Sequence, residues 1–249
     1  MSRVERRTHR ITLPDSYWAL ESVPVLRTLD YSNSIKVTQT SYSVSKLYLK
    51  NHKLHNFAKS AYDEQTFIEN GKHFPVLHQL NTIFEEKFGL SIDYDSIQEY
   101  YGTDVETIAK NKSGIDCSFN LVDSKTREIK QENFSLDFKI RFFHTSAVYD
   151  DFLAEIISQD FGHYSSKMPV PGWAVCKHKL NDAILYIIPG MNKAALVMRK
   201  ELKAGFEKRR FPDRNRKYAK NGRYTTVSVP ISWERLIKVC PSTEIFYYE

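Results

Sequence analysis

The sequence predicts an α+β fold in which a central mixed sheet lies between helices. Two patterns lead to this class: strand-like alternation in the middle of the chain, and helical periodicity in the parts on either side of it. The clearest strand covers 134–142, where five large apolar residues alternate with Ser135, Asp137, Lys139 and Arg141. Because alternate side chains on a strand point to opposite faces, we expect a buried face and a polar face that presents Asp137 beside Lys139.

The N-terminal part of the chain divides into a polar stretch and a helical stretch. Residues 1–50 are polar and only weakly periodic, with two candidate short strands at 34–38 and 45–49. The apolar stripe of the segment 75–88 indicates an amphipathic helix that Gly89 would end. Helices are also predicted at 59–70 and 96–110.

Strands dominate from Gly114 onwards. Alternation over 115–121, then a charged turn at 124–133, leads into the strand at 134–142 and indicates an antiparallel hairpin. Further strands are predicted at 152–158, 173–176, 183–188 and 225–229, and helices at 192–209 and 233–239. The sequence shows no internal repeat and no clear linker. We divide the chain into an N-terminal extension with helices, 1–90, and a core, 91–249.

The basic residues of this chain are concentrated in one segment. The formal net charge of the whole chain is +6, yet residues 199–223 hold eleven basic residues against three acidic ones, a net charge of +8. Such a segment is typical of a polyanion-binding surface, although a solvated helix face would show the same composition. The candidate nucleic-acid-binding residues are those that follow the basic helix: Arg209, Arg210, Arg214, Arg216 and Lys217.

Several other classes of protein are disfavoured. The three cysteines lie far apart without metal-ligand spacing, which suits a reduced intracellular protein. No signal-peptide core or membrane-length apolar stretch is present, so we expect a soluble cytoplasmic protein with no membrane partner. The absence of a phosphate-binding loop and of an HExxH motif argues against ATP-driven and zinc-protease chemistry.

One constellation could carry chemistry. Asp116 opens one predicted strand directly after Gly114-Ile115, and Asp137 and Lys139 lie midway along the next strand. If these strands pair antiparallel, the two carboxylates can converge on one Mg²⁺ ion, with Mn²⁺ as the alternative. Such an ion polarises a phosphodiester and activates water, while Lys139 would orient the water or stabilise charge on the phosphate. The candidate catalytic residues are therefore Asp116, Asp137 and Lys139, with Asp116 and Asp137 as metal ligands.

These residues resemble the motif of the PD-(D/E)XK nuclease superfamily, in which an Asp at a strand start precedes (D/E)-X-K on the neighbouring strand. Gly114-Ile115-Asp116 and Asp137-Phe138-Lys139 match that pattern. The resemblance covers roughly residues 100–240. Within this range, further positions are similar to those of uncharacterised phage and bacterial members: Arg141, the strand around Glu155, Gly172-Trp173, Asp182 and the tail from Asn221 to Thr226. The resemblance implies a restriction-endonuclease-like core and Mg²⁺-dependent hydrolysis of DNA, by an endonuclease rather than an exonuclease, in a bacterial or phage-infected cytoplasm.

The family also implies an acidic residue from a helix that precedes the first core strand. Glu85, Glu86, Glu99 and Glu106 all compete for this role; Glu85 and Glu86 are preferred, but none is chosen. Two alternative functions stay open: a non-catalytic nucleic-acid-binding protein of the same fold, and a phage accessory protein whose basic segment meets an acidic protein partner. A homodimer would suit double-strand cleavage.

Overall fold

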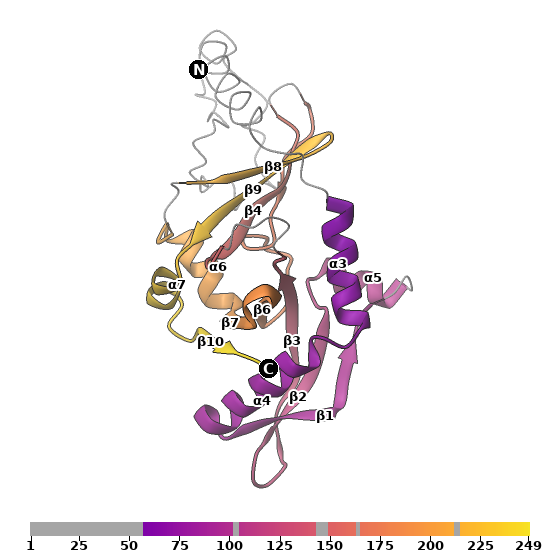
Figure 1. Cartoon of the computed structure of the whole chain (residues 1–249), viewed down its shortest axis with the longest axis vertical. Helices are drawn as coiled ribbons and strands as arrows, with labels where there is room; N and C mark the ends of the chain where they lie inside the picture. The colour runs from indigo at the N-terminus through magenta and orange to yellow at the C-terminus, as the bar shows by residue number, and fades with distance from the viewer. Residues whose placement is uncertain (1–56, 102–104, 143–148, 163–164, 212–214) are drawn as a thin grey trace. The chain divides into compact units, whose positions relative to one another are not determined.

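The computed structural model describes residues 57–101, 105–142, 149–162, 165–211 and 215–249 (Figure 1). The strands predicted at 34–38 and 45–49 lie outside these ranges. The described chain forms two compact units, which are taken separately below. The larger comprises 57–152, 176–211 and 231–249, and the smaller comprises the described residues of 153–175 and 212–230. In the ranges given above, no helix combines the length and the apolarity needed to cross a membrane.

The larger unit contains a six-stranded mixed sheet. Its strands follow the spatial order β1 (Leu90–Glu99), β2 (Cys117–Asp123), β3 (Ile129–Ile140), β6 (Ala183–Ile188), β7 (Lys193–Met198) and β10 (Glu244–Tyr247). Only β3 and β6 pair in parallel; every other neighbouring pair is antiparallel. The predicted hairpin is confirmed, because β2 pairs with β3 with Cys117 opposite Leu136.

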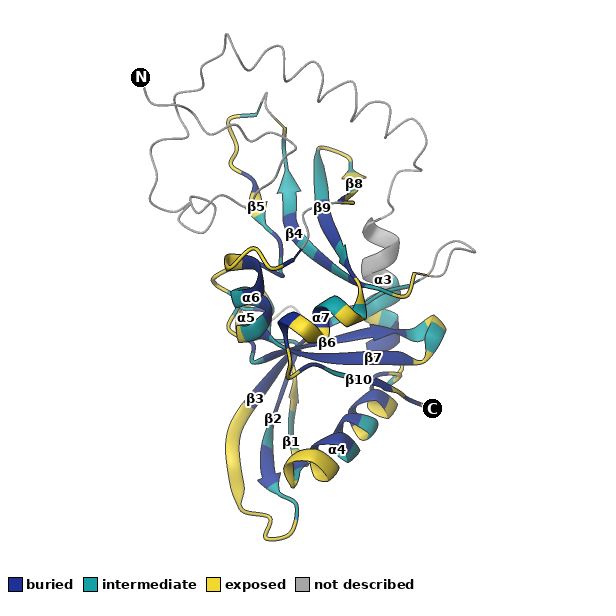
Figure 2. Cartoon of the chain, turned by 90° about the vertical axis from the view of Figure 1, so that its left-hand side faces the viewer, coloured by how far each residue is buried: buried dark blue, intermediate teal, exposed yellow. Residues whose placement is uncertain are grey.

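Five helices accompany this sheet in the larger unit: α3 (Phe57–Glu69), α4 (Phe74–Phe88), α5 (Val105–Lys112), α6 (Arg199–Glu207) and α7 (Trp233–Val239). Apolar side chains of α3 and α4 share one core cluster with alternate residues of β3, β6 and β7, such as Phe138 and Leu185. Helix α6 contacts β6 and β7. Every residue of β6 is buried, as Figure 2 shows, so β6 lies at the centre of the unit.

The smaller unit contains a four-stranded sheet. Its order is β5 (Val170–Pro171), β4 (Phe152–Asp160), β9 (Tyr224–Ile231) and β8 (Lys217–Asn221). Strands β8 and β9 form an antiparallel hairpin that turns at Gly222. A Cβ atom on Gly172 would lie 2.3 Å from the carbonyl oxygen of Glu155, so only glycine allows this close approach of two backbones.

The structure confirms the α+β class and corrects three predicted elements. Strand β1 runs to Glu99, so the helix predicted at 96–110 begins only at Val105. The segment 173–176 is a turn rather than a strand. The helix predicted at 192–209 is wrong in its first half, which forms β7; the run Ala194–Val197 is buried on both faces, and a short apolar run of this kind suits a buried strand as well as a helix. Strands β1, β5, β8 and β10 were not predicted.

Candidate active site

A helix-to-strand turn fixes the position of Asp116. Gly114 has a φ of +74°, and the amides of Gly114 and Ile115 donate to the carbonyls of Asn111 (2.9 Å) and Lys110 (3.0 Å), which is the Schellman pattern that ends a helix. Asp116 follows directly. Its amide donates to the Leu136 carbonyl at 2.8 Å, and its Oδ2 accepts from the Phe138 amide at 2.8 Å. Asp116 is therefore held against β3 by both its backbone and its side chain.

Strand β3 supplies Asp137 and Lys139. Asp137 is 1% exposed, and its Oδ1 accepts from Lys139 Nζ at 2.5 Å. Lys139 Nζ also donates to the Phe138 carbonyl at 2.9 Å. The Asp137 carboxylate is close enough to raise the pKa of Asp116. The other oxygen of Asp137, Oδ2, is buried and has no hydrogen-bond partner among the described residues. The structure thus brings all three candidate catalytic residues together.

Helix α3 adds a third carboxyl group, that of Glu64. Burial raises the pKa of Glu64; the ammonium of Lys139 opposes this shift and the carboxylate of Asp137 adds to it. Glu64 is not among the helix acids predicted from the sequence. A signal was present, because Glu64 lies three and four residues before Phe67 and Ile68, which are buried. An acid on the apolar stripe of a helix is unusual enough to mark a site.

The four candidate helix acids have other surroundings. Glu85 accepts hydrogen bonds from Asn81 and Ser91, both at 2.9 Å. Glu86 and Glu106 are exposed. The Glu99 carboxylate contacts Nε2 of His73. The preference for the helix at 75–88 finds no support in these contacts.

The charges of the site perturb one another strongly. Burial raises the pKa of Asp116 to about 7, and Asp137 adds to the shift, while Lys139 and the Phe138 amide oppose it. Burial by itself would lower the pKa of Lys139, but the carboxylates of Asp137, Asp116 and Glu64 raise it above its ordinary value. At longer range, Asp137 also interacts with Arg199 of α6. Three carboxyl groups thus influence Lys139, and a bound cation would stabilise their ionised forms.

The oxygen atoms around Asp116 and Asp137 could provide some of the ligands of a hard divalent cation. No group of three or more His, Cys, Asp or Glu side chains in the described ranges is arranged to hold a metal ion. Mg²⁺ needs fewer protein ligands than such a group provides, because one or two carboxylates usually bind it together with water and substrate phosphates. Asp116, Asp137 and the Phe138 carbonyl form such a set, and Asp137 Oδ2 is an acceptor with no donor among the described residues.

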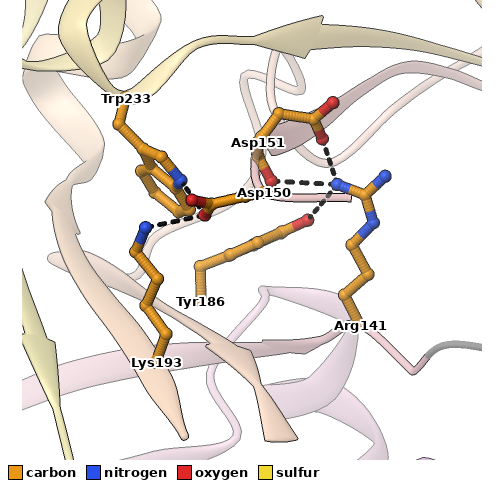
Figure 3. A network of polar contacts seen from close by, with 6 residues as sticks. All are labelled: Arg141, Asp150, Asp151, Tyr186, Lys193 and Trp233. Atoms are coloured by element: carbon orange, nitrogen blue, oxygen red, sulfur yellow. Dashed lines mark hydrogen bonds and ion pairs between the residues drawn. The ribbon is translucent and has the colours of Figure 1, made fainter. Parts of the chain in front are cut away.

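Arg141, the residue directly after the end of β3, belongs to a separate network (Figure 3). Its Nη1 donates to the Asp151 carbonyl at 2.9 Å, to the Asp151 carboxylate, and to the Tyr186 hydroxyl at 3.5 Å. The adjacent Asp150 accepts from Lys193 Nζ at 2.6 Å and from Trp233 Nε1 at 2.5 Å. These bonds hold the residues before β4 against β6, β7 and α7, so Arg141 has a structural role here.

The candidate nucleic-acid-binding residues are distributed over both units. Arg209 and Arg210 are exposed in the larger unit. In the smaller unit Lys217 is exposed but Arg216 is only 7% exposed, and Arg214 lies outside the described residues. The exposed basic side chains of the β8–β9 hairpin are Lys217, Lys220 and Arg223. Of the predicted set, Arg216 is thus the one whose described side chain is not at the surface.

No protein-family model, curated protein or solved structure matches this chain.

Proposed function

We propose that this protein is a Mg²⁺-dependent deoxyribonuclease of the PD-(D/E)XK type. The observation that carries the proposal is the arrangement around Phe138: Asp116, just before β2, accepts from the Phe138 amide, and Lys139 donates to the Asp137 carboxylate and to the Phe138 carbonyl. A purely structural ion pair needs one acid, whereas this site gathers three with Glu64. Burying that much negative charge works against stability, and such clusters of perturbed acids are typical of functional sites.

Each residue has a role in hydrolysis by in-line attack. Asp116, Asp137 and the Phe138 carbonyl would hold Mg²⁺, which when bound polarises the scissile phosphate and lowers the pKa of a bound water. Lys139 donates a hydrogen bond to the attacking water or to a phosphate oxygen, where negative charge develops. Glu64, whose pKa is raised, is suited to accept the proton of the water. The water oxygen bonds to phosphorus as the bond to the leaving oxygen breaks.

Plasmid cleavage tests this proposal. Wild-type protein with Mg²⁺ should nick and linearise the plasmid, and EDTA should abolish the reaction. Asp137→Asn should reduce the rate at least about a hundredfold, the effect of removing one essential electrostatic group. Glu86→Gln, which changes an exposed acid, is the matched control and should cleave normally. Cleavage that survives both EDTA and Asp137→Asn would contradict the assignment.

The alternative of a non-catalytic DNA-binding protein is favoured by one observation, the exposed basic residues of the β8–β9 hairpin. This alternative gives no role to the acid cluster of Asp116, Asp137 and Glu64. It predicts salt-sensitive DNA binding without turnover, and binding that Asp116→Ala does not change. The same plasmid assay, combined with a binding assay, distinguishes the two functions.

A further inference from the structure

A pocket of about 330 Å³ lies beside the acid cluster in the larger unit. Its walls come from the end of α3, the turn before α4 and the end of β1: Ile68, Glu69, Gly71, His73, Phe74, Glu99 and Tyr101. This volume is at the small end of the range for ligand sites, roughly 300–1,000 Å³, and suits one ring system.

Two connections join the pocket to the acid cluster. Glu99 and Tyr101 flank Tyr100, whose amide donates to the Asp116 carbonyl at 2.9 Å. Ile68 follows Glu64 by one turn of α3. The pKa of the Tyr101 hydroxyl agrees with this geometry. Burial raises it most, and the nearby charges of Asp116, Glu99 and Glu64 raise it further. The ring of His73 also packs against that of Phe138, with centroids 5.9 Å apart, so a group bound in the pocket would lie close to the part of β3 that carries Asp137 and Lys139.

The walls of the pocket combine aromatic surface with hydrogen-bond acceptors. Phe74 and Tyr101 are 46% and 37% exposed, so part of each ring is available for contact. Glu69 and Glu99 contribute carboxylates, and no Lys or Arg is among the lining residues. The pocket would thus repel a phosphate group and accept a planar ligand that carries N–H donors.

His73 contacts Glu99 at the edge of the pocket. The ring nitrogen Nε2 of His73 contacts Glu99 Oε1, while Nδ1 is buried and has no partner within the described ranges. A buried N–H without an acceptor is costly, so the proton belongs on Nε2, which donates to Glu99. The Glu99 side chain is still 30% exposed. Its carboxylate can therefore accept a hydrogen bond from a ligand in the pocket.

We propose that this pocket binds an unpaired nucleobase with an exocyclic amino group, cytosine in preference to thymine, next to the scissile phosphate. Glu99 accepts from the cytosine amino group, a position where thymine presents a carbonyl oxygen. Tyr101 or Phe74 stacks on the base, as aromatic residues do in single-stranded DNA sites. This inference rests on the proposed nuclease function and adds a base preference to it.

The first experiment measures cleavage of single-stranded oligothymidylate that contains one cytosine at a defined position. With Mg²⁺, cleavage should concentrate at one fixed distance from the cytosine. There it should be about 5- to 100-fold faster than anywhere in all-thymine DNA, the discrimination that such base contacts give. Tyr101→Leu and Glu99→Gln should each remove most of this preference. Phe88→Leu, which changes an exposed aromatic residue on α4, should retain it.

The second experiment separates failure of the pocket from failure of the nuclease. Binding of labelled tetracytidylate and tetrathymidylate to wild-type protein in EDTA is measured by fluorescence anisotropy, which needs no turnover. Tighter binding of the cytosine tetramer, lost in Glu99→Gln, supports the pocket even if no DNA is cut. Equal binding of the two tetramers, or equal cleavage next to cytosine and thymine, overturns the pocket and leaves the nuclease proposal in place. A cytosine preference that Glu99→Gln and Tyr101→Leu leave unchanged also overturns it.

Discussion

Asp116 shows how the site and the stability of the fold oppose each other. A carboxyl group in an unfolded chain has a pKa near 3.9, whereas burial and Asp137 raise that of folded Asp116 to about 7. The folded state therefore binds the proton more tightly than the unfolded state. The contribution of Asp116 to stability is most favourable at low pH and becomes steadily less so as the pH rises from about 4 to about 7.

We predict that Asp116→Asn stabilises the metal-free protein at high pH. The amide cannot ionise, and its oxygen can still accept from the Phe138 amide. In EDTA, the variant should melt at a higher temperature than wild type at pH 8, and the difference should shrink at pH 5. Thermal melts followed by circular dichroism measure this.

Asp123→Asn is the control for this prediction. The amides of Thr126 and Lys125 lower the pKa of Asp123, so its charge is constant between pH 5 and 8. The melting difference from wild type should then be the same at both pH values. A difference for Asp116→Asn that is equally independent of pH would contradict the raised pKa.

Helix α5 and strand β2 meet at a turn that positions Asp116, and Gly114 is the critical residue of that turn. Gly114 and Gly89 both follow helices in the left-handed conformation, with φ of +74° and +63°. They differ in their surroundings. A Cβ on Gly114 would lie 2.5 Å from Cδ of Lys179 and 3.3 Å from Oδ1 of Asn181, whereas nothing lies within 4 Å of one on Gly89.

We predict that Gly114→Ala costs more in activity than Gly89→Ala. Both should lose about 1 kcal/mol of unfolding free energy, because alanine is strained at positive φ. Only Gly114→Ala must also move Lys179 or the turn, and Asp116 lies two residues away. Urea unfolding and Mg²⁺-dependent cleavage should be measured on the same preparations. Equal fractional losses of activity in the two variants would show that the turn does not set the position of Asp116.

Sequence patterns found the elements with strong local signals. The helix 233–239 and the strand 183–188 have the bounds of α7 and β6, and the alternation of 134–142 identified β3. The run Ala194–Val197 was assigned to a helix because its burial on both faces depends on neighbouring strands that no local pattern reveals. Glu64 was missed for a related reason: it approaches Lys139 and Asp137 through the tertiary fold, from 75 residues away along the chain from Lys139.

The basic segment that dominated the sequence analysis is not one structural feature. Its first part forms α6, where Arg199 is buried and donates to the Cys176 carbonyl at 2.7 Å. Its last part forms the β8–β9 hairpin in the smaller unit, with Lys217, Lys220 and Arg223 exposed. Strand β8 is also the last strand of its sheet, and lysines on such an edge discourage pairing with other chains. Edge protection and DNA binding are therefore competing explanations for these three residues.

The salt dependence of DNA binding separates the two explanations. If the three side chains neutralise phosphates, changing all of them to Gln should reduce the slope of log K against log salt concentration by about 2–3, because each neutralised phosphate of duplex DNA contributes about 0.9. The matched control changes Lys125, Arg127 and Lys130 to Gln, which removes the same charge from exposed residues in and after the β2–β3 turn. Anisotropy titrations with duplex DNA in EDTA give both slopes. Because the two variants have the same net charge, a general effect of charge would reduce both slopes equally, whereas a hairpin that contacts the backbone reduces only the first. An unchanged slope in the hairpin variant, accompanied by aggregation, would assign these residues to edge protection instead.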